Sequence, residues 1–273
     1  MRERLWIALD LETLKEADSL LERLAGAGLP EAVGVKIGSQ LFTAAGPAAV
    51  EMAIKRGFPV FLDLKYHDIP NTVTGAVREA TRMGVAMLNV HASGGVGMMR
   101  AAAEAATKAA KDFGVARPVC IGVTVLTSLD RRGLDEIGVT GNVEAHVLRL
   151  AERACEAGLE GCVASPQEIA LLRRALGPTW RIVTPGIRPQ GGLDATRRGG
   201  PGGAGEDAAR RGGPGGAAGA PRLVDDQARI ATAAAAIAAG ADAIVVGRPI
   251  TAAPDPHAAA VALLAEIGRA TTA

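Results

Sequence analysis

Short apolar runs alternate along the chain with longer segments in which apolar residues recur every three to four positions. The short runs are rich in Val, Ile and Leu and predict β-strands, whereas the longer pattern predicts amphipathic helices. Several helical segments end at a glycine, which suits the left-handed residue that often closes a helix. The pattern predicts eight strands, over residues 5–10, 33–38, 59–65, 87–92, 118–126, 161–165, 181–187 and 241–248.

This alternation predicts the fold class. Eight strands, each followed by a helix, within 273 residues are the number expected of a (β/α)8 barrel. An open doubly wound sheet usually has fewer strands, and no G-x-G-x-x-G motif follows the first strand. We therefore expect a single TIM-barrel domain over residues 1–273, with helices covering a parallel sheet.

One segment departs from the alternation. Residues 190–221 contain 12 Gly among 32 residues, and the sequence RRGGPGG occurs at 197–203 and again at 210–216. This composition cannot bury enough apolar surface to order itself, so we expect a flexible Gly-rich insertion in the loop after the seventh strand. Arg-Gly-Gly tracts also occur in RNA-binding segments, but two short copies with acids between them favour an insertion without a binding role.

Composition and charge narrow the choice of partners. Lys and Arg number 30 and Asp and Glu number 29, so the net charge of +1 favours neither nucleic acid nor an acidic membrane as a partner. No apolar segment is long enough for a membrane span, and the N-terminus lacks a signal-peptide pattern. The three cysteines, Cys120, Cys155 and Cys162, have no C-x-x-C spacing. We interpret them as reduced core residues of a cytoplasmic protein.

Polar residues follow the apolar part of seven predicted strands. The active sites of (β/α)8 barrels lie at the C-terminal ends of the strands, so these residues are expected to converge on one rim. They are Asp10, Lys36, Asp63, Lys65, His91, Thr124, Arg188 and Arg248.

The third predicted strand leads into the most highly charged stretch, DLKYHDIPNT, over residues 63–72. Alternate residues of a strand share a face, so Asp63 and Lys65 are expected to point the same way, with Lys36 on the neighbouring strand and Asp68 in the next loop. Charges of alternating sign make burial tolerable, and a lysine in such a set can donate a proton. An ion-pair network that only closes the barrel is the alternative, although such networks belong more often to the opposite rim.

The last two predicted strands end in a second cluster, which predicts an anion site. Arg188 ends one strand, and Gly247 and Arg248 end the other. Barrels commonly bind phosphate with these two loops, where glycine lets backbone N–H groups approach and arginine can bind bidentately. Gln227, in the sequence DDQAR, is a further candidate donor.

Other polar side chains are less specific. Thr127 and Ser128 offer hydroxyl groups beyond the fifth strand for a ring carbonyl or imide, and His91 suits a structural role as well as a catalytic one. The remaining histidines have no metal-ligand spacing, so we expect no zinc site.

The motifs resemble those of the orotidine 5′-phosphate decarboxylase family. LDLKYHDIPNTV matches the family signature D-x-K-x-x-D-I-x-x-T, and the stretches IALD, VKIG, NVHASGG, VTVLTS, VASPQE, TPGIRP, DDQARIAT and IVVGRPIT follow in the family's order. The resemblance covers the chain except the Gly-rich segment and is closest in pattern to single-domain bacterial members. It implies conversion of orotidine 5′-phosphate to UMP in pyrimidine biosynthesis, without a metal or organic cofactor.

The resemblance also implies a role for each matching residue. Lys65 would protonate C6 as CO2 leaves, Asp63 would lie beside the departing carboxylate, and Lys36 would order that acid. Asp68 would enter the active site of a neighbouring subunit, which implies a homodimer with shared sites. The remaining implied contacts are Asp10 and Lys36 on the ribose, Thr72 across the dimer interface, Thr127 and Ser128 towards the base, and Arg188, Gln227, Gly247 and Arg248 on the phosphate.

Two other functions fit part of the pattern. A Mg²⁺-dependent sugar-phosphate decarboxylase or aldolase of the same suprafamily uses a related D-x-K-x-x-D core, but the DIPNT and VTVLTS stretches favour the orotidylate enzyme. A nucleotide-binding barrel without turnover would have no use for Lys65 beside two acids. The 38 residues between Arg188 and Gln227 exceed the family's spacing. We therefore expect a modest loss of substrate affinity, which a variant lacking residues 191–220 would recover.

Overall fold

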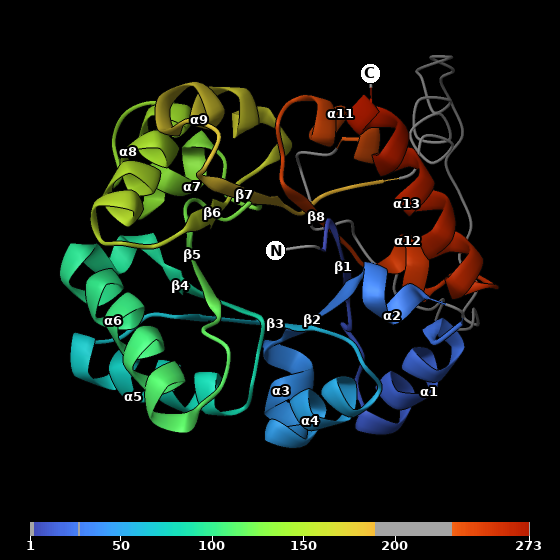
Figure 1. The fold of residues 1–273 in the computed structure, drawn as a ribbon. Coiled ribbons are helices and arrows are strands. Elements are labelled where there is room, and N and C mark those ends of the chain that lie inside the picture. The colour runs from blue at the N-terminus through green and yellow to red at the C-terminus, as the bar shows by residue number, and fades with distance from the viewer. Residues whose placement is uncertain (1–2, 27, 189–230, 273) are drawn as a thin grey trace, which may run out of the picture.

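Eight parallel strands form a closed barrel in the computed structural model, which describes residues 3–26, 28–188 and 231–272. Each strand pairs with the next along the chain, and the last pairs with the first. Figure 1 shows the strands around the centre and the helices outside them. The predicted (β/α)8 barrel is confirmed. Its strands are β1 (Leu5–Ala8), β2 (Gly34–Gly38), β3 (Val60–Tyr66), β4 (Met87–His91), β5 (Val119–Val123), β6 (Gly161–Val163), β7 (Arg181–Thr184) and β8 (Ala243–Val246).

The helices cover the outer face of the sheet, and several begin at the side-chain caps expected of Thr and Asn. Thr13 accepts a hydrogen bond from the N–H of Glu16, and Asn142 accepts from Glu144 and Ala145. The described helices are α1 (Leu14–Leu24), α2 (Leu29–Ala32), α3 (Ser39–Ala45), α4 (Pro47–Lys55), α5 (Pro70–Arg82), α6 (Gly95–Phe113), α7 (Arg131–Glu136), α8 (Val143–Glu156), α9 (Ile169–Leu176), α11 (Ala233–Ala238), α12 (Arg248–Thr251) and α13 (Pro256–Thr272), with 3-10 turns at Ala92–Gly94 and Pro166–Glu168.

Both faces of the barrel strands are buried, because side chains alternate between the barrel interior and the helix layer. The interior is filled by a small cluster: Trp6, Ala8, Phe61, Met87, Ile121, Val183, Ala243 and Val245. The rings of Trp6 and Phe61 meet edge to face with their centroids 5.9 Å apart. Gly34 makes room for the indole, since a Cβ there would lie 2.2 Å from the ring of Trp6.

The observed strands lie where the sequence predicts them, but most end earlier than predicted. The first strand stops at Ala8 rather than residue 10, and the fifth stops at Val123 rather than residue 126. Of the polar residues predicted at the strand ends, Asp10, Thr124, Arg188 and Arg248 therefore follow the strands, whereas Lys36, Asp63, Lys65 and His91 lie within them. The Gly-rich segment at 190–221 lies outside the described residues.

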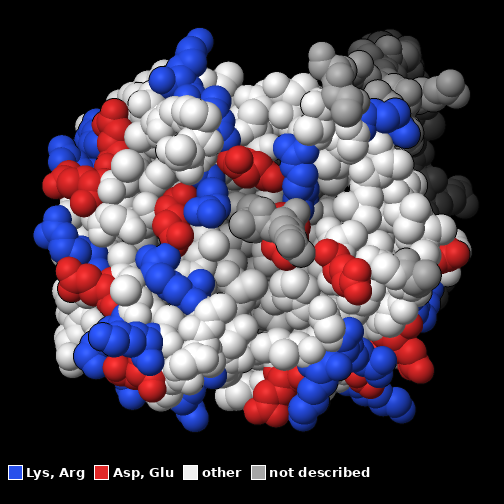
Figure 2. All heavy atoms as spheres, in the orientation of Figure 1, with Lys and Arg blue, Asp and Glu red and all other residues white. Residues whose placement is uncertain are grey.

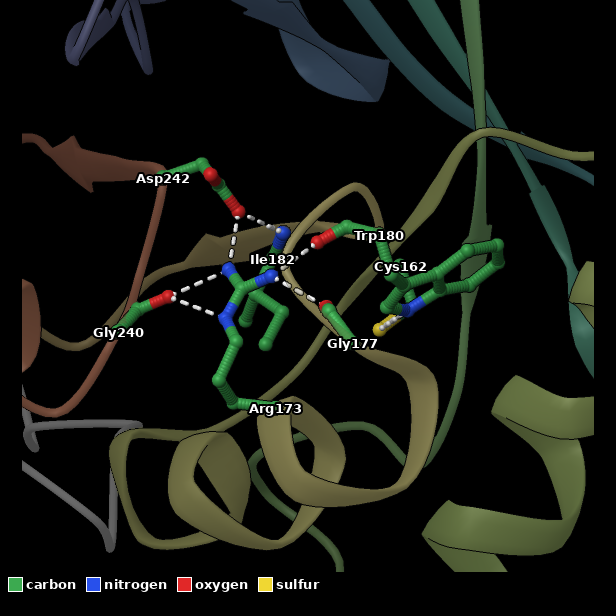
Figure 3. A network of polar contacts seen from close by, with 7 residues as sticks. All are labelled: Cys162, Arg173, Gly177, Trp180, Ile182, Gly240 and Asp242. Carbon is green, nitrogen blue, oxygen red and sulfur yellow. Dashed lines mark hydrogen bonds and ion pairs between the residues drawn. The ribbon is translucent and has the colours of Figure 1, made fainter.

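The N-terminal rim of the barrel is held by an arginine on α9 (Figure 3). Arg173 donates to three backbone carbonyls and pairs with Asp242 at 2.6 Å. Asp242 also accepts the N–H of Ile182 at 2.8 Å, so one carboxylate links β7 to the residue before β8. The carbonyls are those of Gly177, Trp180 and Gly240, at 2.8, 2.7 and 2.6 Å. This network is structural, since it lies at the end of the barrel opposite the active-site rim.

Charges of both signs are interspersed on the face shown in Figure 2, as the small net charge suggests. In the described part of the chain, no helix has the length and apolar character needed to cross a membrane. Cys120 and Cys162 are buried as predicted, but Cys155 is exposed on α8, so the prediction of a third core cysteine is wrong. The apolar stripe of this helix runs through Val147, Leu150, Ala151 and Ala154 and leaves residue 155 outside it.

Candidate active site

Three charged side chains from β2 and β3 form a continuous chain at the C-terminal rim of the barrel. The carboxylate of Asp63 lies between two ammonium groups, with Lys36 Nζ 3.3 Å from Oδ2 and Lys65 Nζ 2.7 Å from Oδ1. Lys36 Nζ also donates to Asp10 Oδ1 at 3.1 Å, from the loop after β1. The structure thus brings together four of the residues that the sequence predicted for the site.

The middle of this chain is shielded from water. The side chains of Lys36 and Asp63 are 11% and 12% exposed, whereas those of Lys65 and Asp10 are 34% and 62% exposed. Burial alone raises the pKa of Asp63, but the two lysines and the hydrogen-bond donors outweigh it and hold that pKa below its ordinary value. Burial alone lowers the pKa of Lys36, but Asp63 and Asp10 bring it above the ordinary value. Both groups are therefore charged at neutral pH.

Lys65 reaches Asp63 through an irregularity in β3 that the sequence did not predict. Leu62 pairs with Leu88 and Tyr66 pairs with Val90, so residues 63–65 of β3 face a single residue of β4. Within this bulge Lys65 has a φ of 51°, the only positive φ of a non-glycine residue in the described part of the chain. Bulges next to active sites commonly redirect a side chain, and here the bulge turns Lys65 back towards Asp63.

The single residue of β4 opposite the bulge is Asn89, which was not among the predicted site residues. Its side chain is fully buried. Its amide nitrogen donates to Asp63 Oδ1 at 2.7 Å, and its oxygen accepts the backbone N–H of Lys65 at 2.8 Å. A polar amide flanked by the apolar residues Leu88 and Val90 in the middle of β4 was the signal that could have identified it, because buried amides need partners.

The ends of β2 and β8, the two strands beside β1, lie close to the carboxylate of Asp10. A Cβ on Gly38 would lie 3.2 Å from Lys36 Nζ and 3.5 Å from Asp10 Oδ1, so a side chain there would crowd this ion pair. A Cβ on Gly247, after β8, would lie 3.8 Å from Asp10 Oδ2. Gly247, predicted for the phosphate, thus lies beside the charged chain.

Asp68, in the loop after β3, and Thr72, in the first turn of α5, lie near Lys65. Together with Lys65 they line a cavity of about 340 Å³. Both are exposed, and the carboxylate of Asp68 accepts the N–H of Ile69 at 2.6 Å. Among the described contacts none joins Asp68 to Lys36, Asp63 or Lys65. Of the four charged residues predicted to form one network, three are therefore in contact within this chain.

Two histidines flank the same rim. The rings of His67 and His91 lie 5.4 Å apart and are tilted by 41°. Burial, with smaller contributions from His67 and Lys65, lowers the pKa of His91, so His91 is neutral at pH 7. Thr124, also predicted at this rim, donates its hydroxyl to the carbonyl of Val163 at 2.9 Å and ties β5 to β6.

The other predicted site residues are less closely defined. Thr127 is half-buried and Ser128 exposed in the loop after β5. Arg188 follows β7, where its N–H donates to the carbonyl of Ala231, and Arg248 begins α12 directly after β8. Gln227 lies outside the described residues. Within the ranges that the structure covers, no three His, Cys, Asp or Glu side chains are grouped as a metal site.

The fold and the site define the class of protein. A closed (β/α)8 barrel with a lysine–aspartate–lysine chain at its C-terminal rim has the architecture of a barrel enzyme, because catalytic groups collect at this rim. The chain belongs to the orotidine 5′-phosphate decarboxylase / HUMPS family, whose profile matches residues 3–212 and 214–263.

Individual relatives agree with the family match. The chain is 48% identical over 267 residues to orotidine 5′-phosphate decarboxylase of Moorella thermoacetica, covering 97% of this chain and 92% of the relative. It is 46% identical to the enzyme of the same name from Halorhodospira halophila, covering 98% and 97%. The crystal structure of orotidine 5′-phosphate decarboxylase from Lactobacillus acidophilus superposes with a TM-score of 0.76 at 32% identity, covering 96% of this chain and 98% of that one.

Proposed function

We propose that this protein removes CO2 from orotidine 5′-phosphate to give UMP, the last step of UMP synthesis. The observation that carries the proposal is the chain Lys36–Asp63–Lys65, in which a buried carboxylate holds an ammonium group at the rim of the barrel. Membership of the family and the names of the relatives from Moorella and Halorhodospira support the same reaction.

The reaction needs a fixed cation, and Lys65 is placed to supply it. When the bond between C6 and the carboxylate breaks, its electron pair stays on C6 in the plane of the pyrimidine ring, where no carbonyl group can take up the charge. An ammonium held beside C6 stabilises this charge, and transfer of one of its protons gives the C6–H bond of UMP. Lys65 is then a neutral amine, and its side chain, 34% exposed, can regain a proton from solvent.

Asp63 and Lys36 prepare that cation. Asp63 fixes Lys65 by a hydrogen bond of 2.7 Å, and its own charge would repel the carboxylate of the substrate, which leaves as CO2. Lys36 keeps Asp63 ionised. Both oxygens of Asp63 are engaged by protein donors, Oδ2 by Lys36 and Oδ1 by Lys65 and Asn89. This occupancy favours a reaction without a metal ion over the Mg²⁺-dependent alternative, which would use an open carboxylate.

The family resemblance suggests the remaining substrate contacts. Asp10 and Lys36 would bind the ribose hydroxyl groups, and Thr127 and Ser128 would approach the base. The phosphate would lie at the ends of β7 and β8, bound by Arg188, Gln227, Gly247 and Arg248. Binding energy from this distant phosphate can support catalysis at C6 by ordering the substrate and excluding water.

We further propose that the protein works as a homodimer in the cytoplasm. Asp68 and Thr72 are exposed on the lip of the cavity beside Lys65, a position from which they could enter a partner's site. Substrate and product are phosphate esters that do not cross membranes unaided, which supports a cytoplasmic location.

The activity is tested by following the loss of the orotate chromophore with orotidine 5′-phosphate in the presence of EDTA. Turnover that EDTA leaves unchanged is expected, and turnover that requires added Mg²⁺ would contradict the proposal. The shared site has its own test, in which inactive Lys65→Ala and Asp68→Ala chains are mixed. A heterodimer would contain one intact site, so activity should return on mixing, whereas sites built within one chain would stay inactive.

A further inference from the structure

Asn89 is a buried amide where the barrel pattern calls for an apolar side chain. Its neighbours in the barrel interior are Met87, two residues earlier on β4, and Ile121, its register partner on β5. Asn89 is fully buried, and burying an amide is costly unless both its ends have partners. The hydrogen-bond partners of its amide nitrogen and oxygen therefore explain why an asparagine is found at this position.

Both partners of Asn89 belong to the catalytic part of β3. The amide nitrogen donates to Oδ1 of Asp63, the same oxygen that holds the ammonium of Lys65. The amide oxygen accepts the backbone N–H of Lys65. One side chain thus holds the carboxylate that orients the ammonium and the backbone from which that ammonium extends.

The second of these contacts compensates for the bulge in β3. Residues 63–65 face Asn89 alone, so the N–H of Lys65 has lost the regular partner that a sheet ladder would give it. Lys65 also has a φ of 51°, a conformation that persists in a residue with a side chain only where the surroundings enforce it. The oxygen of Asn89 supplies the missing acceptor at 2.8 Å.

We propose that Asn89 is a positioning residue for the decarboxylation, acting through Asp63 and Lys65 without touching the substrate. It fixes the rotamer of the Asp63 carboxylate and the left-handed backbone of Lys65, and so sets where the ammonium lies relative to C6. This inference rests on the proposed function. It predicts that loss of Asn89 impairs the chemical step and leaves binding of the nucleotide largely intact, because the ribose and phosphate contacts come from other strands.

The test compares Asn89→Ala and Asn89→Asp with the wild type and with a control, Asp242→Asn. Asn89→Ala removes both hydrogen bonds, whereas Asn89→Asp keeps the shape and the acceptor for Lys65 but sets a carboxylate 2.7 Å from Asp63. Asp242 likewise accepts a backbone N–H from a strand, that of Ile182, and it forms an ion pair with Arg173 (Figure 3). Because it lies at the opposite rim of the barrel, its variant controls for a loss of stability alone. The readouts are kcat with orotidine 5′-phosphate, Kd for UMP by calorimetry, and the urea midpoint.

For Asn89→Ala we expect kcat to fall by about 100-fold, as for a displacement of a catalytic group by about 1 Å, with Kd for UMP within about threefold of wild type. Asn89→Asp should lower kcat and move the acid limb of its pH profile to higher pH, since adjacent carboxylates share a proton. Asp242→Asn should keep kcat. The inference is overturned if kcat of Asn89→Ala stays within about threefold of wild type, or if Kd weakens as much as kcat falls.

Two further outcomes distinguish failure of the positioning role from misfolding of a variant and from failure of the proposed function. If Asn89→Ala does not fold, Asn89→Asp decides, and a wild-type kcat and pH profile in that variant would overturn the positioning role. If the wild-type protein itself fails to convert orotidine 5′-phosphate, the proposed function falls before Asn89 is tested.

Discussion

Replacing Lys36 with methionine tests the electrostatics of the site. Methionine keeps the length and apolar stem of lysine but removes the ammonium, which lies 3.3 Å from Asp63 and 3.1 Å from Asp10. The two partners should respond differently, since the side chain of Asp63 is 12% exposed and that of Asp10 is 62% exposed. Water can replace the cation at Asp10 but hardly at Asp63.

The magnitude follows from that geometry. Two unit charges 3.3 Å apart attract by about 5 kcal/mol at an effective dielectric constant of about 20. The variant no longer has to bury the ammonium, and Asp63 keeps Lys65 and Asn89, each at 2.7 Å. We therefore expect the free energy of unfolding to fall by about 3 kcal/mol, the low end of the cost of breaking a buried pair.

Urea unfolding at pH 7 and one protein concentration measures this loss, with the buried Trp6 and Trp180 as fluorescent probes. The matched control is Lys55→Met, because Lys55 forms an exposed pair with Glu51 at 3.8 Å and should lose at most about 0.5 kcal/mol. The penalty of Lys36→Met should shrink as the pH falls, since protonation of Asp63 removes the buried charge that has lost one of its two cations. Equal stability of Lys36→Met and wild type, or a loss that acidification leaves unchanged, would refute the reasoning.

Three other predictions concern the remaining charged and titratable groups. The pKa of Asp63 is lowered and that of Lys36 is raised, so their contribution to stability should be complete between about pH 4 and pH 10. It should be lost as the pH falls through the lowered pKa or rises through the raised one, which urea midpoints measured from below about pH 4 to above about pH 10 would show. Arg173→Ala should cost about 3 kcal/mol of unfolding free energy, because it removes charged hydrogen bonds to three carbonyls, while kcat stays unchanged. Of the three cysteines only Cys155 should react with a thiol reagent in the native protein, since burial raises the pKa of the other two to about 12; three fast-reacting thiols would contradict this.

The fold could be predicted because two periodicities alternate clearly along the chain. Each predicted strand is present, and glycines such as Gly84 and Gly158 follow helices with φ values of 78° and 84°. Some strand ends could not be placed well: β5 stops at Val123, although Val125 and Leu126 continue the apolar run beyond the last residue of the strand. Cys155 is exposed because it lies outside the apolar stripe of α8, which the composition of the surrounding sequence does not reveal.

The charges of the site could also be predicted, but their geometry could not. Strand alternation correctly suggested that Lys65 reaches Asp63, yet it does so through a bulge with a left-handed residue. That conformation depends on an acceptor from β4, a tertiary contact that local sequence does not reveal. Asn89 lies in the stretch NVHASGG, in which His91 is the titratable residue. A buried amide without charge is recognised only once its partners are known.

The measurement that tests the central claim most directly is kcat of wild type and Lys65→Ala with orotidine 5′-phosphate in EDTA, together with Kd for UMP. Loss of both the proton donor and the cation should lower kcat by at least about 10⁴-fold while UMP still binds. Turnover that persists in Lys65→Ala, or a wild-type protein that binds UMP but does not release CO2, would contradict the account.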